Sequence, residues 1–240
     1  MYHLGTRFCL APLYEAIPIR RLLYLRGLET APHLPVGLLT TPVRYASGGS
    51  SLSWFLDVLS PLERREALRG GQNPYHRLLL EMPPEPSPVL AAPPEEGGVG
   101  LIWGLSTANT RGELVRAVLE GLALQTVEGQ QRLLDVGIPL EVYRATGGGS
   151  RSGQWLQITA DVTGYPVERT AEEQTATLGA AIVAAHGSGA FASLTTAVEA
   201  LVRVVDRYEP DAERQAHYRL RLAQLATLRQ TSARLADASH

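Results

Sequence analysis

The sequence predicts an α/β fold, in which strands and helices alternate along one chain. The chain has 240 residues, of which 45% are hydrophobic, so it can build a substantial core. Residues 111–136 carry apolar side chains at helical spacing and predict one long helix. A short apolar strand at 140–145 then runs into three consecutive glycines, and the pattern continues as helix, strand and helix over 152–162, 166–169 and 175–186.

Composition excludes several classes of protein. The net charge is −2 and the pI about 6.3, so the chain has no overall positive charge. We therefore expect it to bind neither nucleic acid nor an anionic membrane. The chain contains no lysine, which excludes a Walker A loop, the strand lysine of protein kinases and a lysine Schiff base. Cys9 is the only cysteine, so no internal disulfide is possible. Without a signal peptide or a membrane-spanning run of about 18 apolar residues, we expect a cytoplasmic protein.

The first hundred residues predict short strands, one helix and one loop. Residues 1–45 read as short β runs broken by Gly and Pro. Residues 51–59 place Leu and Phe at helical spacing, with Ser50 or Ser51 as the N-cap. Residues 82–100 are rich in Pro, Glu and Gly and predict a surface loop, followed by a strand at 99–105.

The last fifty residues predict helices. Residues 193–205 and 211–237 both have helical composition and spacing. We expect residues 206–240 to form a C-terminal helical extension, packed on the outside of the domain or against something that this chain does not contain.

The glycine run is the strongest chemical signal. The segment ATGGGSRSGQWLQITADVTGYPV begins at Ala145, and glycines there let the backbone approach a ligand while the next helix offers N–H groups. The glycine run forms either a phosphate-binding loop or only a tight turn between a strand and a helix. A dinucleotide fingerprint requires glycine three positions after Gly149, but Ser152 stands there. Ser150 is interpreted as a helix cap.

Residues 98–211 resemble the C-terminal domain of the FGGY family of carbohydrate kinases, which includes xylulokinases, gluconokinases and glycerol kinases. Four ordered motifs carry the resemblance. They are GLSTANTRGELVRAVLEGLALQ from Gly104, TGGGSRSGQWLQITADVTGYPV from Thr146, ATLGAAIVAAHGSGAF from Ala176, and the Tyr-Glu-Pro-Asp that begins at Tyr208.

Two earlier segments extend the resemblance. Gly5-Thr6 is similar to the family's phosphate-contacting hairpin, although Arg7 stands where a small residue is usual. SGGSSLSWFLDVL is similar to the helix whose glycine, here Gly49, lies beside the nucleotide. LLLEMPPEP replaces the usual substrate-side loop. The resemblance implies ATP and Mg²⁺ as cofactors, and nucleotide contacts from Gly5, Thr6, Gly49, Gly147, Gly148, Gly149 and Ser152; it assigns no catalytic or metal-ligating residue.

The resemblance also implies an actin/ribonuclease H-like fold, a mixed sheet flanked by helices. We expect residues 1–240 to form a single C-terminal, nucleotide-side domain that lacks the N-terminal domain, where the sugar site and the catalytic base lie. The expected function is the ATP-binding half of a kinase that phosphorylates a sugar or polyol hydroxyl, inactive without its N-terminal half. The alternative is a truncated or non-catalytic module for nucleotide binding or association. A homodimer and a split-kinase partner chain both stay open.

Other polar residues have ordinary interpretations. The six histidines show no metal-ligand spacing. Asp161 is predicted to be structural, and the three tryptophans to serve packing. Two arginines at the start of the long helix, Arg111 and Arg116, are expected to form weak surface pairs with Glu113 and Glu120.

Overall fold

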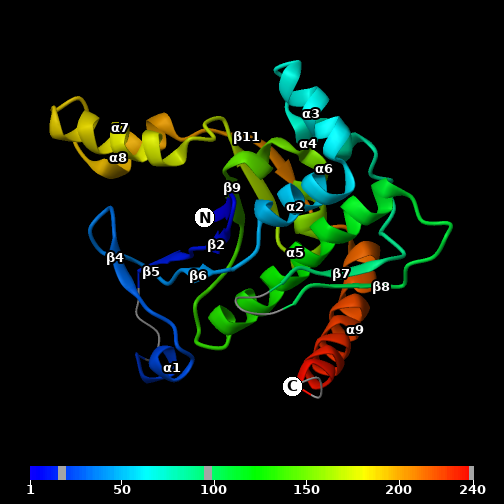
Figure 1. The fold of residues 1–240 in the computed structure, drawn as a ribbon. Helices are drawn as coiled ribbons and strands as arrows, with labels where there is room; N and C mark the ends of the chain where they lie inside the picture. The colour runs from blue at the N-terminus through cyan, green and yellow to red at the C-terminus, as the bar shows by residue number, and fades with distance from the viewer. Residues whose placement is uncertain (16–19, 95–98, 238–240) are drawn as a thin grey trace.

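The fold is built on a six-stranded mixed sheet with helices against it (Figure 1), as predicted. The computed structural model describes residues 1–15, 20–94 and 99–237. The strand order is β11-β10-β9-β1-β2-β6. These strands are β1 (Tyr2–Leu4), β2 (Phe8–Leu10), β6 (Val43–Arg44), β9 (Tyr143–Thr146), β10 (Val167–Thr170) and β11 (Val204–Tyr208).

Strand direction determines which loops meet. The strands β1, β2 and β6 are antiparallel neighbours, whereas β9 runs parallel to β1 and to β10. In the central pair, His3 lies opposite Thr146. Because neighbouring parallel strands end at the same edge of a sheet, the hairpin after β1 and the glycine loop after β9 lie side by side.

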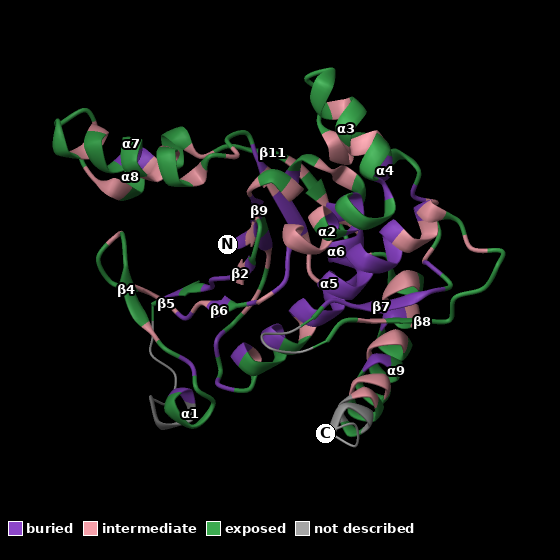
Figure 2. Cartoon of the chain, in the orientation of Figure 1, coloured by how far each residue is buried: buried purple, intermediate pink, exposed green. Residues whose placement is uncertain are grey.

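One helix forms the centre of the molecule. α5 (Arg111–Leu134) begins at a capping box made by Thr110 and Glu113. The sequence predicts a single apolar stripe on it, but residues 115–126 are buried on every side (Figure 2). One side of α5 meets the sheet, where the Tyr2 hydroxyl is 2.8 Å from Thr126 Oγ1. α6 (Gly153–Thr163) packs beside it.

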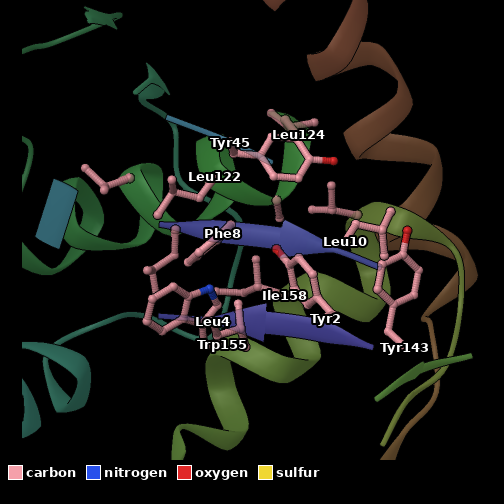
Figure 3. Close-up of a cluster of buried hydrophobic side chains, with 14 of the residues drawn as sticks. Tyr2, Leu4, Phe8, Leu10, Tyr45, Leu122, Leu124, Tyr143, Trp155 and Ile158 are labelled. Atoms are coloured by element: carbon pink, nitrogen blue, oxygen red, sulfur yellow. The ribbon is translucent and has the colours of Figure 1, made fainter. Parts of the chain in front are cut away.

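Aromatic side chains from distant parts of the chain fill the space between the sheet and the helices (Figure 3). The ring of Tyr2 makes edge-to-face contacts with Phe8 and Tyr143, at centroid distances of 5.6 and 5.3 Å. Phe8 also contacts Trp155 of α6, at 5.7 Å. These pairs join β1, β2, β9 and α6 in one core, and such pairs contribute about 0.5–1.5 kcal/mol each beyond the area that they bury.

The predicted surface loop at 82–100 is wrong for its central part. Residues 89–92 are nearly inaccessible to solvent, and β7 (Leu90–Ala92) pairs with β8 (Leu101–Trp103). The apolar run Val89–Ala92 packs on α5, which outweighs the turn-forming prolines around it. The part of this loop at 95–98 lies outside the described residues.

Short elements account for most other differences from the sequence prediction. The sequence did not predict α1 (Arg20–Leu25), which lies near the small sheet of β3 (Leu13–Tyr14), β4 (Ala31–His33) and β5 (Leu38–Thr40). The helix predicted for 193–205 is wrong at its end, because residues 204–208 pair with β10 as a strand. The C-terminal extension is therefore a helix only from residue 212, and residues 238–240 lie outside the described part.

The remaining helices lie around this centre. They are α2 (Gly49–Leu59), α3 (Pro61–Arg69), α4 (Pro74–Leu80), α7 (Thr175–Gly187), α8 (Leu194–Leu201) and α9 (Ala212–Asp237). α9 packs on α6 and β7, whereas α7 and α8 pair with each other and project from the body (Figure 1). Among the helices described, none is both long enough and apolar enough to cross a membrane.

Candidate functional site

A cavity of about 790 Å³ lies where β1 and β9 end. Its wall contains six of the seven residues predicted to contact a nucleotide, namely Gly5, Thr6, Gly49, Gly148, Gly149 and Ser152. The seventh, Gly147, does not line the cavity and instead forms the turn that leads the chain into it. Segments distant in sequence thus meet at one place.

The hairpin after β1 and the start of α2 are held together by main-chain hydrogen bonds. The N–H of Gly49 donates to the carbonyl of Gly5 at 2.9 Å, and that of Ser50 donates to Thr6 at 3.1 Å. The N-cap residue is Gly48, and no side chain caps the helix. The prediction of Ser50 or Ser51 as N-cap is therefore wrong, because carbonyls of the hairpin accept the N–H groups that a cap would satisfy.

The three glycines after β9 have different environments. Gly147 has a φ of 84°, in the region that favours glycine, and a Cβ there would lie 3.1 Å from the carbonyl oxygen of Leu4. A Cβ on Gly149 would lie 2.9 Å from Leu4 Cβ and 3.0 Å from Trp155 Cζ3. A Cβ on Gly148 would meet nothing within 4 Å. Two glycines therefore allow close packing, and Gly148 leaves space open at the cavity.

Ser152 holds the first turn of α6 at the cavity. Its hydroxyl accepts a hydrogen bond from the N–H of Trp155 at 3.2 Å, as an N-cap does. Ser150 instead donates to the carbonyl of Gly147 at 2.7 Å. The prediction of Ser150 as the helix cap is therefore wrong, and Ser152 caps α6. Gly153 and Gln154 also line the cavity. The positive end of the α6 dipole therefore faces into it.

The sequence predicted the helix α2 in the opposite wall but not the helix α4. This wall comes from α2 and α4, which contribute Leu52, Ser53, Asn73, Tyr75, His76, Leu79 and Leu80. The hydroxyls of Ser53 and Tyr75 are 2.7 Å apart and join the two helices. Asn73 caps α4 by accepting from the N–H of Tyr75 at 2.9 Å. The Asn73-Pro74 pair is a helix-start signal that could have identified α4.

The residues that line the cavity favour a neutral or anionic ligand. In the part of the chain that the structure describes, they include Arg151 and His76 and no carboxylate. Arg151 is exposed and donates from Nε to Glu173 at 2.6 Å. Arg7 is exposed beside the hairpin but does not line the cavity. Among the residues that the structure describes, no three His, Cys, Asp or Glu side chains gather as a metal-ligand set.

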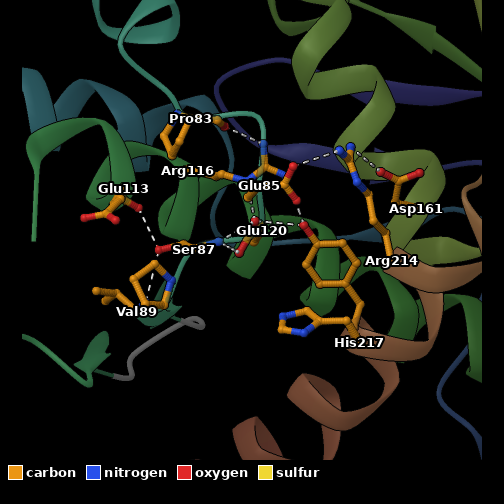
Figure 4. Close-up of polar contacts among 12 residues, drawn as sticks. Pro83, Glu85, Ser87, Val89, Glu113, Arg116, Glu120, Asp161, Arg214 and His217 are labelled. Atoms are coloured by element: carbon orange, nitrogen blue, oxygen red, sulfur yellow. Dashed lines mark hydrogen bonds and ion pairs between the residues drawn. The ribbon is translucent and has the colours of Figure 1, made fainter.

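Arg116 and Glu120 form the predicted pair, but the prediction that it lies at the surface is wrong. Their side chains are only 4% and 5% exposed, with Nε and Oε1 2.7 Å apart (Figure 4). The Tyr218 hydroxyl of α9 and the N–H of Ser87 also donate to Glu120. Burial raises the pKa of the Glu120 carboxyl, which these donors offset in part. The network joins α5 to α9 and to the chain before β7, away from the cavity.

Arg111 also differs from its predicted pairing with Glu113. Its guanidinium donates to both oxygens of Glu81, at 2.8 and 2.6 Å, and to Glu63. Glu113 instead accepts from the N–H of Thr110 in the capping box. Arg111 therefore joins α3 and the end of α4 to the start of α5, and so supports the α4 part of the cavity wall.

Asp161 has the structural role that the sequence predicts. Its side chain is fully buried in α6, and Oδ1 accepts from the N–H of Asp211 at 2.9 Å. Arg214 Nη1 lies 3.6 Å from Oδ2 (Figure 4). The carboxylate thus joins α6 to the start of α9.

Comparisons with known proteins agree with this architecture. Residues 82–188 match the C-terminal domain of the FGGY family of carbohydrate kinases. A glycerol kinase from Gloeobacter violaceus is 35% identical over 164 residues, which cover 58% of this chain and 33% of that protein. The crystal structure of xylulose kinase from Rhodospirillum rubrum superposes with a TM-score of 0.77 at 29% identity and covers 96% of this chain.

A structure of Plasmodium falciparum glycerol kinase with ADP shares the fold at 20% identity, with a TM-score of 0.74, over 94% of this chain and 46% of that one. The chain spans about a quarter to a third of the curated relatives that it matches, and just under half of the solved kinases. The match over residues 82–188 and the shared actin/ribonuclease H-like fold show that the chain carries a C-terminal domain of the FGGY family of carbohydrate kinases.

Proposed function

We propose that this chain is the ATP-binding side of a kinase that transfers the γ-phosphoryl group to a sugar or polyol hydroxyl. The observation that carries the proposal is the convergence of the hairpin, the glycine loop and the first turn of α6 on one cavity without a lining carboxylate. Main-chain N–H groups and a helix N-terminus favour phosphate oxygens there. Relatives that are named glycerol kinase and xylulose kinase support the reaction class.

The environments of the glycines suggest how the nucleotide lies. We propose that its phosphates follow the Gly5-Thr6 hairpin and the turn from Gly147 to Gly149, near Ser152. The base then lies toward α2 and α4, where Leu79 and Leu80 of α4 offer apolar surface. Gly49 gives its N–H to the hairpin, so any contact that it makes with the nucleotide comes from its Cα.

ATP would bring Mg²⁺ with it, and the ion would neutralise charge on the phosphates. The chain's own contribution is to bind and orient the nucleotide. Within the described ranges 1–15, 20–94 and 99–237, no carboxylate lines the cavity to accept the proton of an acceptor hydroxyl, so we propose that the base comes from another half of the kinase. That half would be an N-terminal domain, a split partner chain or a second copy, and it would also choose the sugar.

The test uses Gly148→Val. A Cβ at this position would meet no protein atom within 4 Å, and Gly148 lines the cavity, so the variant should fold normally while its branched side chain takes up part of the ligand's proposed space. Nucleotide affinity should therefore fall. Gly179→Val on α7 is the matched control, since a Cβ there also meets nothing within 4 Å and lies outside the cavity wall. Calorimetric titration with Mg·ATP should give a dissociation constant more than about tenfold weaker for Gly148→Val alone.

Unchanged ATP affinity in Gly148→Val, with an unfolding temperature equal to wild type, would contradict the placement of the nucleotide. A wild-type chain that binds no ATP at millimolar concentration would favour the non-catalytic association module. A kinase assay on pentoses, gluconate and glycerol addresses the other half of the proposal, because turnover by this chain alone would show that no second half is needed.

A further inference from the structure

We infer that His3 is a positioning residue, whose imidazole sets the spacing between the two main-chain loops that receive the phosphates. The inference rests on the proposed function. His3 lies on β1, two residues before Gly5, and its neighbours Tyr2 and Leu4 point into the core while its own side chain lies on the other face of the sheet. It is only partly exposed.

A hydrogen bond across the sheet fixes the ring. His3 and Thr146 are register partners in the parallel pair of β1 and β9, and His3 Nδ1 is 3.2 Å from Thr146 Oγ1. Thr146 is the last residue of β9 and directly precedes Gly147. The bond therefore links the strand that leads into the hairpin to the strand that leads into the glycine loop.

The far edge of the same ring occupies the side-chain space of both loops. A Cβ on Gly5 would lie 2.3 Å from His3 Nε2, closer than any real contact. A Cβ on Gly147 would lie 3.1 Å from His3 Cε1. Gly5 has no φ in the left-handed region, so the contact that a side chain at this position would make is with the imidazole, which would have to move to admit it. One ring thus sits against the hairpin and the glycine loop at once.

This arrangement controls the geometry of a diphosphate. An imidazole is rigid and has only two side-chain torsions, so a ring held at Nδ1 acts as a spacer of fixed width. If one loop binds one phosphate and the other loop binds the next, the distance between the two loops has to stay constant to within about 0.5 Å. A chain of phosphates that bridges both loops should therefore depend on the ring, whereas a nucleoside, which reaches toward α2 and α4, should not.

The first experiment titrates the full chain with ADP and with adenosine. His3→Ala should weaken ADP binding about tenfold and leave adenosine binding unchanged. His3→Asn can still hydrogen bond to Thr146 and should recover part of the ADP affinity. His33→Ala, which removes an exposed imidazole of β4, should change neither affinity. Equal losses for ADP and adenosine, or no loss in His3→Ala, would overturn the inference.

The second experiment needs no ligand. Gly5→Ala should destabilise the wild-type chain, because its methyl group collides with the ring, and it should cost little when combined with His3→Ala. Equal unfolding midpoint shifts in both backgrounds would show that the ring does not fill this space. If wild type binds no ADP, the proposed function fails, while this mutant cycle still decides where the ring lies.

Discussion

At the scale of single residues, the site depends on contacts that the local sequence does not contain. The run of three glycines predicts a close approach between backbone and ligand, but it does not say which glycine lies open at the cavity. That assignment follows from Leu4 and His3, which lie against Gly147 from the start of the chain. The sequence therefore predicts that glycines line the site. The different environments of Gly147, Gly148 and Gly149 could be assigned only from the tertiary structure.

The buried ion pair of Arg116 and Glu120 gives a prediction at this scale. Glu120→Ala leaves the Arg116 guanidinium buried without its carboxylate, and should lower the free energy of unfolding by about 3–5 kcal/mol. Asp57→Ala removes the partner of Arg64 at an exposed pair and should cost no more than about 1 kcal/mol. Urea unfolding at neutral pH measures both, and similar costs would contradict the burial of the network.

At the scale of elements, long helices could be predicted and short elements could not. The apolar period placed the central helix at 111–136, and α5 spans Arg111–Leu134. β7 and α4 are short, and each depends on a neighbour for its stability, since β7 packs on α5 and α4 packs on α3 and α5. Both sequences contain residues typical of turns. Whether each forms a strand or a helix depends on the elements that it packs against.

Close packing of α5 on β7 can be tested by adding one methyl group. A Cβ on Gly121 would lie 2.1 Å from the carbonyl oxygen of Ala91, so Gly121→Ala should lower the free energy of unfolding by about 1–3 kcal/mol or more. Gly179→Ala adds the same group in open space on α7 and should be neutral or stabilising by up to about 1 kcal/mol. Equal denaturant midpoints for the two variants would contradict the contact.

The contacts that Arg111 makes with Glu63 of α3 and with Glu81 at the end of α4 should respond to acid. Hydrogen bonds from Arg111 lower the pKa of Glu63 and of Glu81 below their ordinary value of 4.5. The folded state thus favours the charged carboxylates, and their contribution to stability is present above pH 4.5 and lost as the pH falls through the lowered pKa values. In Arg111→Gln, the free energy of unfolding should fall less steeply below pH 4.5 than in wild type. Parallel pH profiles would contradict this role.

At the scale of the whole molecule, the described residues form a well-packed body from which the α7–α8 pair projects. In these two helices only Ile182 and Ala197 are buried, whereas α5 is buried on all sides over twelve residues, 115–126 (Figure 2). The fold class and the mixed sheet could be predicted from the motifs and their order. The projection of α7 and α8 could not, because their apolar composition resembles that of a buried helix.

Hydrogen exchange should reproduce this contrast. Helices with few buried contacts open locally at low free energy, so the amides of α7 and α8 should exchange well before those of α5 and α6. Mass spectrometry of peptides from 175–201 and 111–134 measures the difference. Equal protection of the two segments in the isolated chain would show that the pair is packed against a surface.

The pairing of β1 with β9 has a consequence for how the chain folds. The hydrogen bond between His3 and Thr146 joins residues 143 positions apart, so the two strands meet only after a long loop has closed. A partly folded chain in which α5 and α6 have formed, but these strands have not, holds only one side of the cavity. After dilution from denaturant, helical signal should therefore return before the cavity does, and the last structure to form should be the one that the proposed reaction uses.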